Sequence, residues 1–283
     1  MQSLIDVLLK IFFAKMSKPL FSIITITFNS EKTVERTLKS VLNQTYKDYE
    51  YIIVDGASKD GTMDIVRKYE PLFEGRMKWK SEPDTGIYNA MNKGIMRSTG
   101  EIIGIVNSDD WLEPDALEIL ADEIAKDDTN RSKILTGEVL FHYEDGDPQL
   151  YPTSYERYAH FATRYCMGLN HPATFVPRCI YDKMGIFDEQ FKLYADADFI
   201  IRCYNAGVPV HFIHQVLSNM ADGGASNTRD KRSLSDSLLK YKKHAKSKSE
   251  YRRLYIKTYI NWYLSALVPE WYVRYYRRRH NKK

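Results

Sequence analysis

LFSIITITFN, residues 20–29, sets the architecture of this chain. The β-branched, apolar run from Leu20 to Thr27 has the length and composition of a buried strand. A helix is expected directly after it, because Asn29 or Ser30 can cap a helix whose apolar residues recur at helical spacing. Those apolar residues are Val34, Leu38, Val41 and Leu42. A buried strand that leads into a helix is typical of an α/β protein.

The same alternation of strand and helix continues toward residue 124. Further strands are expected at residues 51–54, 77–80 and 102–106, and a helical pattern follows each of them. Short apolar strands that alternate with helices indicate an α/β fold, with a mostly parallel sheet and helices on both faces. Ligands of such sheets bind beyond the carboxyl ends of the strands, so the polar residues there are the first candidates for a site.

The rest of the chain adds strands, helices and a tail. Strand patterns are found at 134–151, 173–176 and 208–213, and helical patterns at 155–165, at 199–205 and beyond 230. The polar segment 222–227, DGGASN, is the best candidate for a boundary. We therefore expect an N-terminal amphipathic segment at 1–18, a main α/β domain at 19–227 and a helical tail at 228–283.

Charge is divided unevenly between the body and the tail. From Arg229 to the end there are 17 Lys/Arg and 4 Asp/Glu, a net of +13, whereas the rest carries 24 and 33, a net of −9. A basic tail rich in Tyr and Trp favours an anionic lipid surface, with a helix packed on the body as the alternative. Nucleic acid is not an expected partner, because no recognised nucleic-acid motif accompanies the charge. The apolar stretches at 4–13 and 259–268 are too short to span a bilayer.

Two adjacent carboxylates follow the strand expected at 102–106, in the sequence Asn107-Ser108-Asp109-Asp110. Mg²⁺ and Mn²⁺ prefer oxygen ligands and often take one or two carboxylates together with substrate phosphates. The alternative is an ordinary helix N-terminus, where Asp is common. The three cysteines are isolated from one another and indicate neither a zinc site nor a disulfide framework.

Two other strand ends carry polar segments that contain glycine. VDGASKDGT, residues 54–62, places Asp55 where a carboxylate can accept a hydrogen bond from a base or a ribose hydroxyl. EPDTGIYNAMNKG, residues 82–94, opens a helix that Asp84 or Thr85 can cap. Each segment also suits an ordinary polar loop, so neither identifies a function alone.

In this order and spacing, these segments resemble those of family 2 glycosyltransferases with the GT-A fold. The resemblance covers about residues 19–227 and includes LYADADF at 193–199, which is similar to the family's acidic motif before a helix. Each segment alone is a weak signal, but five segments in register form a specific one. The resemblance implies a Rossmann-like, mixed and mostly parallel sheet, with the C-terminal helices as an extension, and a nucleotide-diphosphate sugar donor.

The resemblance also implies a role for each matched residue. The implied nucleotide-sugar-binding residues are Thr27, Asn29, Asp55, Asp84, Asn107 and Asp110, the implied ligand of Mn²⁺ or Mg²⁺ is Asp109, and the implied general base is Asp196. Asn107 replaces the first Asp of the family's Asp-x-Asp element. Ala195 replaces a Glu that often precedes the base, which leaves Asp198 as an alternative to Asp196. Helical spacing turns these two carboxylates apart, so only one is expected to face the donor.

The segment GLNHPAT, residues 168–174, resembles one that is common in bacterial polysaccharide members of the family. The resemblance places His171 on the acceptor side of the site. A buried, hydrogen-bonded histidine is the alternative.

Together these features imply an inverting glycosyltransferase that acts on a saccharide acceptor, most simply a lipid-linked one, in surface polysaccharide biosynthesis. We expect it in the cytoplasm, peripheral at the inner face of the cell membrane. A catalytically silent scaffold that binds nucleotide sugars is the alternative, because Asn107 and Ala195 depart from the family pattern. A nucleotidyltransferase is less favoured, since the first strand is followed by TFNS and not by a glycine-rich basic loop.

Overall fold

The computed structural model describes residues 18–143, 146–222 and 231–266, and the chain divides into two compact units. The larger unit holds the described residues up to 190 and those from 195 to 222, and the smaller holds Phe191–Tyr194 and residues 231–266. Almost all of the predicted N-terminal segment, and most of the predicted boundary at 222–227, lie outside the described residues. The domain limits at 18/19 and 227/228 therefore stay predictions.

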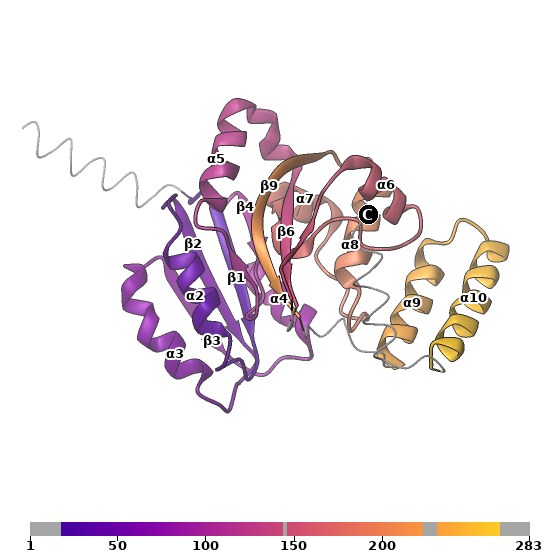
Figure 1. Cartoon of the computed structure of the whole chain (residues 1–283), viewed down its shortest axis with the longest axis horizontal. Helices are drawn as coiled ribbons and strands as arrows, with labels where there is room; N and C mark the ends of the chain where they lie inside the picture. The colour runs from indigo at the N-terminus through magenta and orange to yellow at the C-terminus, as the bar shows by residue number, and fades with distance from the viewer. Residues whose placement is uncertain (1–17, 144–145, 223–230, 267–283) are drawn as a thin grey trace, which may run out of the picture. The chain divides into compact units, whose positions relative to one another are not determined.

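The first half of the sheet in the larger unit is parallel (Figure 1). Its strands are β1 (Phe21–Thr27), β2 (Tyr49–Asp55), β3 (Met77–Ser81) and β4 (Ile102–Ile105). β1 pairs with β2 on one side and with β4 on the other, and β3 pairs with β2. The register sets Thr27 opposite Asp55 and Asp55 opposite Ser81, so three polar side chains meet at the carboxyl ends of the strands.

The second half of the sheet is mixed. Its strands are β5 (Trp111–Leu112), β6 (Ile134–His142), β7 (Gln149–Tyr151), β8 (Thr174–Pro177) and β9 (Val210–Ala221). β8 joins β4 in antiparallel orientation, and the order runs β3-β2-β1-β4-β8-β6-β9-β5, with β7 beside β6. β6 and β9 run parallel, with register shifts on either side of Glu138. The predicted α/β fold with a mixed sheet is confirmed.

Helices cover both faces of this sheet. They are α2 (Val34–Leu42), α3 (Thr62–Tyr69), α4 (Ile87–Arg97), α5 (Ala116–Lys126), α6 (Tyr155–Ala162), α7 (Arg178–Met184) and α8 (Ala195–Asn205), with short 3-10 turns at Glu70–Phe73, Asp128–Ser132 and His171–Ala173. Successive strand residues point to opposite faces, so Ile23 packs in the core with α2 while Ile24 meets α4 at Gly94. A Cβ at Gly94 would lie 2.5 Å from Cγ2 of Ile24, so glycine allows α4 to approach the sheet.

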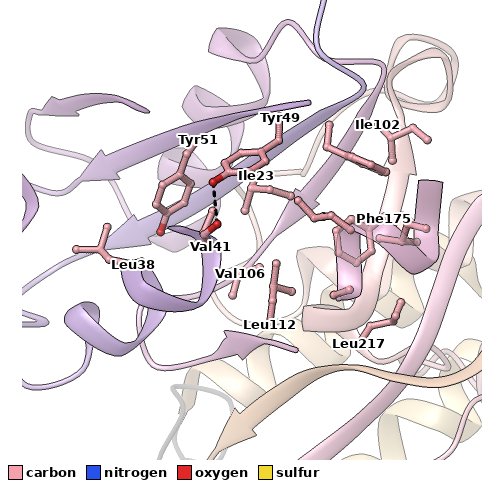
Figure 2. Close-up of a cluster of buried hydrophobic side chains, with 14 of the residues drawn as sticks. Ile23, Leu38, Val41, Tyr49, Tyr51, Ile102, Val106, Leu112, Phe175 and Leu217 are labelled. Atoms are coloured by element: carbon pink, nitrogen blue, oxygen red, sulfur yellow. Dashed lines mark hydrogen bonds between the residues drawn. The ribbon is translucent and has the colours of Figure 1, made fainter. Parts of the chain in front are cut away.

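Figure 2 shows part of the buried core, in which α2 packs on β1 and β2. Leu38 and Val41 of α2 are fully buried, and the Tyr49 hydroxyl donates to the Val41 carbonyl at 2.8 Å. Burial of each large apolar side chain stabilises the fold by about 1.5–3 kcal/mol. This packing fixes β1 and β2, and with them the strand ends that carry Thr27 and Asp55.

The smaller unit consists of α9 (Lys231–His244), α10 (Lys248–Ala266) and the segment Phe191–Tyr194. Asp236 of α9 is buried, and one of its carboxylate oxygens accepts from the backbone N–H groups of Lys192, Leu193 and Tyr194. These bonds tie the short segment to the first tail helix. No helix within the described ranges is long and apolar enough to cross a membrane.

Several predicted boundaries and caps are wrong. The helix predicted at 199–205 begins at Ala195, and the strand predicted at 208–213 continues to Ala221 because it pairs with β6 and then with β5. The side chain of Asn29 does not cap α2, since its Oδ1 already accepts from the N–H of Lys59. Neither Asp84 nor Thr85 caps α4, which follows Gly86 at a φ of 138°.

Candidate active site

Asp55 lies at the centre of a saturated hydrogen-bond cluster. The residue is fully buried at the end of β2. One carboxylate oxygen accepts from the hydroxyls of Thr27, at 2.9 Å, and Ser58. The other accepts from the Ser58 N–H at 3.0 Å and from the Ser81 hydroxyl at 2.6 Å. The ends of three neighbouring strands therefore hold this carboxylate in one orientation.

The loops after β1 and β2 are tied together above Asp55. Asn29 has a φ of 51°, and its backbone N–H donates to the Ser58 hydroxyl at 2.8 Å. Its side-chain oxygen accepts from the Lys59 N–H at 2.9 Å. A Cβ at Gly56 would lie 2.5 Å from Asp84 Oδ2 and 3.2 Å from Phe28, so Asp84 and the exposed Phe28 ring border the same glycine. The structure thus brings Thr27, Asn29, Asp55 and Asp84 together.

The second cluster follows β4 and is acidic. Asp110 is buried, and burial and the charge of Asp109 raise its pKa to about 8. The Asn107 side-chain amide donates to Asp110 Oδ2 at 3.3 Å. Burial also raises the pKa of Asp109, against the effect of the Arg36 guanidinium. Two carboxyls therefore share a site in which ionisation of both is costly.

Arg36 brings positive charge to the edge of this cluster without binding its carboxylates. Its Nη2 donates to the backbone oxygen of Asp109 at 2.7 Å, and its guanidinium carbon lies 3.8 Å from the centre of the Trp111 ring. Ser30 and Ser108 share a hydrogen bond of 2.9 Å, which joins the acidic cluster to the loop after β1. The two clusters are thus connected through one loop.

The acidic cluster suits a hard divalent cation in its chemistry. Asn107 Oδ1 is buried and has no hydrogen-bond partner among the described residues. Two carboxyls and a free amide oxygen are oxygen ligands of the kind that Mg²⁺ and Mn²⁺ prefer. Over the described ranges, however, no three His, Cys, Asp or Glu side chains gather as a complete metal site.

Asp196 lies in the first turn of α8, apart from Asp198. The Tyr88 hydroxyl of α4 donates to Asp196 Oδ1 at 3.0 Å, whereas Asp198 is buried and forms an ion pair with Arg202 at 2.9 Å. The two carboxylates thus face different partners, as their helical spacing predicts. Asp196 lines a pocket.

That pocket also contains His171, so the structure places the two residues together. Nδ1 of His171 is buried and has no hydrogen-bond partner in the described part of the chain. Burial lowers the pKa of His171, and the charge of Asp196 acts in the opposite direction. Ile105 of β4 lines the same pocket and precedes Asn107 by two residues, so the pocket and the acidic cluster lie at the same end of β4.

Sequence reasoning missed the side chains that bind or border the carboxylates. Ser58 and Ser81 bind Asp55, Tyr88 binds Asp196, and Arg36 lies beside Asp109. Ser81 could have been predicted from the sequence, because it ends the strand that follows the one ending in Asp55. Arg36 and Tyr88 could not, since each looks like an ordinary helix residue until its partner, 73 or 108 residues away, is known.

Comparison with known proteins gives consistent results. Residues 22–183 match the family description "Glycosyl transferase family 2". The chain is 30% identical over 220 residues to a PGL/p-HBAD biosynthesis glycosyltransferase of Mycobacterium bovis, an alignment that covers 75% of this chain and 81% of the relative.

Two solved structures share the fold. S. aureus TarS 1–349 in complex with UDP-GlcNAc aligns with a TM-score of 0.62 and 20% identity, over 88% of this chain and 73% of that one. The mannosyltransferase PcManGT from Pyrobaculum calidifontis in complex with GDP-Man and Mn²⁺ aligns with a TM-score of 0.57 and 18% identity, over 91% and 77%. Since the matching family description spans more than half of the sequence, the chain belongs to the family 2 glycosyltransferases and has their GT-A fold.

Proposed function

We propose that the chain transfers a sugar from a nucleotide-diphosphate donor to a saccharide hydroxyl, with inversion at the anomeric carbon. The observation that carries this proposal is the position of the Asp196 pocket and the Asn107–Asp110 cluster at the same end of β4. Structures of the same fold were solved with UDP-GlcNAc and with GDP-Man, which supports a donor of this class.

Asp196 is the proposed general base. A sugar hydroxyl is a poor nucleophile at neutral pH, and a carboxylate within hydrogen-bond reach accepts its proton as the bond to the anomeric carbon forms. Asp198 is a poorer candidate because its carboxylate is buried against Arg202. Attack opposite the leaving diphosphate inverts the anomeric centre.

The nucleotide lies, in this proposal, along the loops after β1, β2 and β3. Asn29 is exposed and Asp84 partly so, which supports contact between these side chains and the ligand. Thr27 and Asp55 are buried and hydrogen-bonded to each other, so their proposed role is to hold the loops after β1 and β2 in place. Asn29 and Asp84 would therefore contact the nucleotide, and the buried pair would support the loops.

Asp109, Asp110 and Asn107 would hold a divalent cation, Mn²⁺ or Mg²⁺. Bound there, the cation would neutralise negative charge that develops on the leaving diphosphate. The Asn107 amide oxygen without a partner and the raised pKa of Asp110 both support a site that lacks positive charge. PcManGT, which shares the fold, was solved with Mn²⁺.

The acceptor is proposed to be lipid-linked, in surface polysaccharide assembly, with the tail bound to the inner face of the cell membrane. α10 exposes apolar side chains along its length, and Arg252, Arg253 and Lys257 are exposed on the same helix. The exposed apolar residues are Tyr255, Ile256, Ile260, Tyr263 and Leu264. Apolar and aromatic residues combined with basic ones favour binding to an anionic lipid surface.

Turnover of a nucleotide-sugar panel with Mn²⁺, measured as release of nucleoside diphosphate, tests the enzymatic proposal. Asp196→Asn is expected to lower turnover by about 100-fold or more, because it removes the base. Asp182→Asn, at an exposed carboxylate of α7, is the matched control and should leave turnover unchanged. Binding of a nucleotide sugar without turnover, over the whole panel of donors and acceptors, would instead support a silent scaffold.

Sedimentation with phosphatidylserine-containing vesicles tests the membrane proposal. The double variant Ile256→Ser/Ile260→Ser should weaken binding by about 100-fold or more, since each buried methylene contributes about 0.8 kcal/mol and each substitution removes several carbons. Leu72→Ser, at an apolar residue that is 53% exposed in the larger unit, should not. Equal binding by all three proteins would contradict a membrane role for α10.

A further inference from the structure

Tyr88 is held so that its hydroxyl reaches Asp196. The tyrosine is 5% exposed, and its ring packs against Phe187 with 5.6 Å between ring centres. The hydroxyl donates to Asp196 Oδ1 at 3.0 Å. Burial, and then the negative charge of Asp196, raise the pKa of Tyr88 well above its ordinary value. Tyr88 therefore remains a neutral donor and does not compete as a base.

The two oxygens of the Asp196 carboxylate are unequally occupied. Oδ1 accepts from Tyr88 and also from the Ala197 N–H at 2.8 Å. No hydrogen bond reaches Oδ2 from the residues that the structure describes. Because Oδ1 is doubly bound, Oδ2 is the oxygen left to take a proton from an acceptor.

His171 shares the pocket with this carboxylate. The walls around the two residues are otherwise mostly apolar, with Ile105, Val176 and Phe199 among them, and the space suits about one water molecule. The buried Nδ1 of His171 has no hydrogen-bond partner among the described residues. Tyr181 also lines the pocket and stacks on Phe199.

We propose that Tyr88 and His171 are positioning residues for Asp196. Tyr88 fixes Oδ1 and so directs Oδ2 to the acceptor hydroxyl, and the His171 ring confines the reacting hydroxyl on the other side of the pocket. Tyr88 acts through Asp196, His171 acts on the acceptor hydroxyl beside Asp196, and neither acts on the donor. This inference rests on the proposed function, because it assigns Asp196 the role of base.

Tyr88→Phe tests the first half of the proposal, because it removes the hydroxyl and keeps the ring. The expected result is a fall in kcat of about 10- to 100-fold, part of the contribution that a well-placed base makes. The KM for the donor should change less than twofold, because donor binding does not involve Tyr88.

Tyr158→Phe is the matched control. Tyr158 is also buried, at 2% exposed, and its hydroxyl has no hydrogen-bond partner within the described ranges. It packs on Tyr204 and Phe212 and is not among the residues that line the pocket. Removal of this hydroxyl should leave both kcat and KM unchanged.

The outcomes separate this inference from the proposed function. A wild-type chain without turnover, or turnover that survives Asp196→Asn, overturns the proposed function and this inference with it. Wild-type turnover that is lost in Asp196→Asn and equal in Tyr88→Phe and Tyr158→Phe overturns only the role of Tyr88. A rise in KM with kcat unchanged would also contradict it, because it would place Tyr88 in donor binding.

His171→Gln tests the second half and serves as a second variant if Tyr88→Phe fails to fold, which a thermal melt reveals. Glutamine keeps a neutral polar side chain but not the ring. The expected result is a rise in hydrolysis of the donor relative to transfer, since water is less well excluded from Asp196. An unchanged ratio of hydrolysis to transfer would overturn the role of His171.

Discussion

The cluster around Asp55 and the acidic cluster around Asp110, both at the edge of this sheet, are built in opposite ways. Asp55 and Asp110 are both buried, at 0% and 2% exposed. The Asp55 carboxylate accepts four hydrogen bonds, three of them from hydroxyls and one from a backbone N–H. Asp110 has the Asn107 amide at 3.3 Å and the Ala221 backbone N–H, with a second carboxyl, Asp109, as its neighbour.

Donors from the chain itself fill the hydrogen-bonding positions of the Asp55 carboxylate. The Asp110 carboxyl has fewer donors and a second carboxyl beside it. Asp55 has all the donors that its geometry requires and needs no ligand to be stable. Burial and Asp109 raise the pKa of Asp110 to about 8, so the ionised cluster is costly in the isolated protein. A buried charge of this kind is stable once it is paired, and a divalent cation would pair it.

The largest expected effect is at Asp55. Asp55→Ala leaves the Ser58 N–H and the hydroxyls of Thr27, Ser58 and Ser81 without this acceptor, which should lower the free energy of unfolding by about 3 kcal/mol. The melting temperature should fall by roughly 6–12 °C. Asp64→Ala, at an exposed carboxylate of α3, is the control and should change it by about 1 °C or less. Equal melting temperatures for Asp55→Ala and Asp64→Ala would show that the hydrogen bonds to Asp55 do not stabilise the fold.

A change of opposite sign is expected at Asp110. In EDTA, Asp110→Asn should raise the free energy of unfolding by about 1–2 kcal/mol. Asparagine has nearly the shape of aspartate but carries no charge, so the substitution removes a costly buried charge. A raised folded pKa means that the folded state holds the proton more tightly, so the carboxyl costs stability above its unfolded pKa. The advantage of asparagine should therefore grow from about pH 4 to about pH 8. Thermal melts at both pH values measure it, and a loss of stability would contradict the account.

The smallest effect is expected at a single donor to Asp55. Ser81→Ala removes one of four hydrogen bonds and should lower the free energy of unfolding by about 1 kcal/mol. In the Asp55→Ala background the same substitution should cost almost nothing, because its partner is already absent. Equal costs in both backgrounds, measured by urea unfolding, would show that Ser81 acts independently of Asp55.

The fold was largely predictable from local patterns. The run from Leu20 to Thr27 and the helical spacing of Val34, Leu38 and Val41 lead directly to β1 and α2. The two-residue strand β5 and the extension of β9 to Ala221 were not predictable. Each exists because of a pairing partner about 100 residues away, which leaves no local periodicity.

The candidate site was predictable in the residues that follow the strands and open the helices. Asp55, Asp109 and Asp196 stand at strand or helix ends, where the order of elements brings them to one edge of the sheet. The Tyr88 hydroxyl that binds Asp196 and the Arg36 guanidinium that binds the backbone of Asp109 come from helix faces whose partners lie in other segments. Their role depends on packing distance, which a pattern of residue types does not contain.

Calorimetric titration of UDP and of GDP, with and without Mn²⁺, tests most directly whether the Asn107–Asp110 cluster holds a cation. The wild-type chain and the Asp182→Asn control should bind at least one of the nucleotides more tightly with Mn²⁺, by about 10-fold or more. Asp109→Asn should lose that difference without a fall in its melting temperature. An equal Mn²⁺ effect in Asp109→Asn and in the wild-type chain would contradict the account.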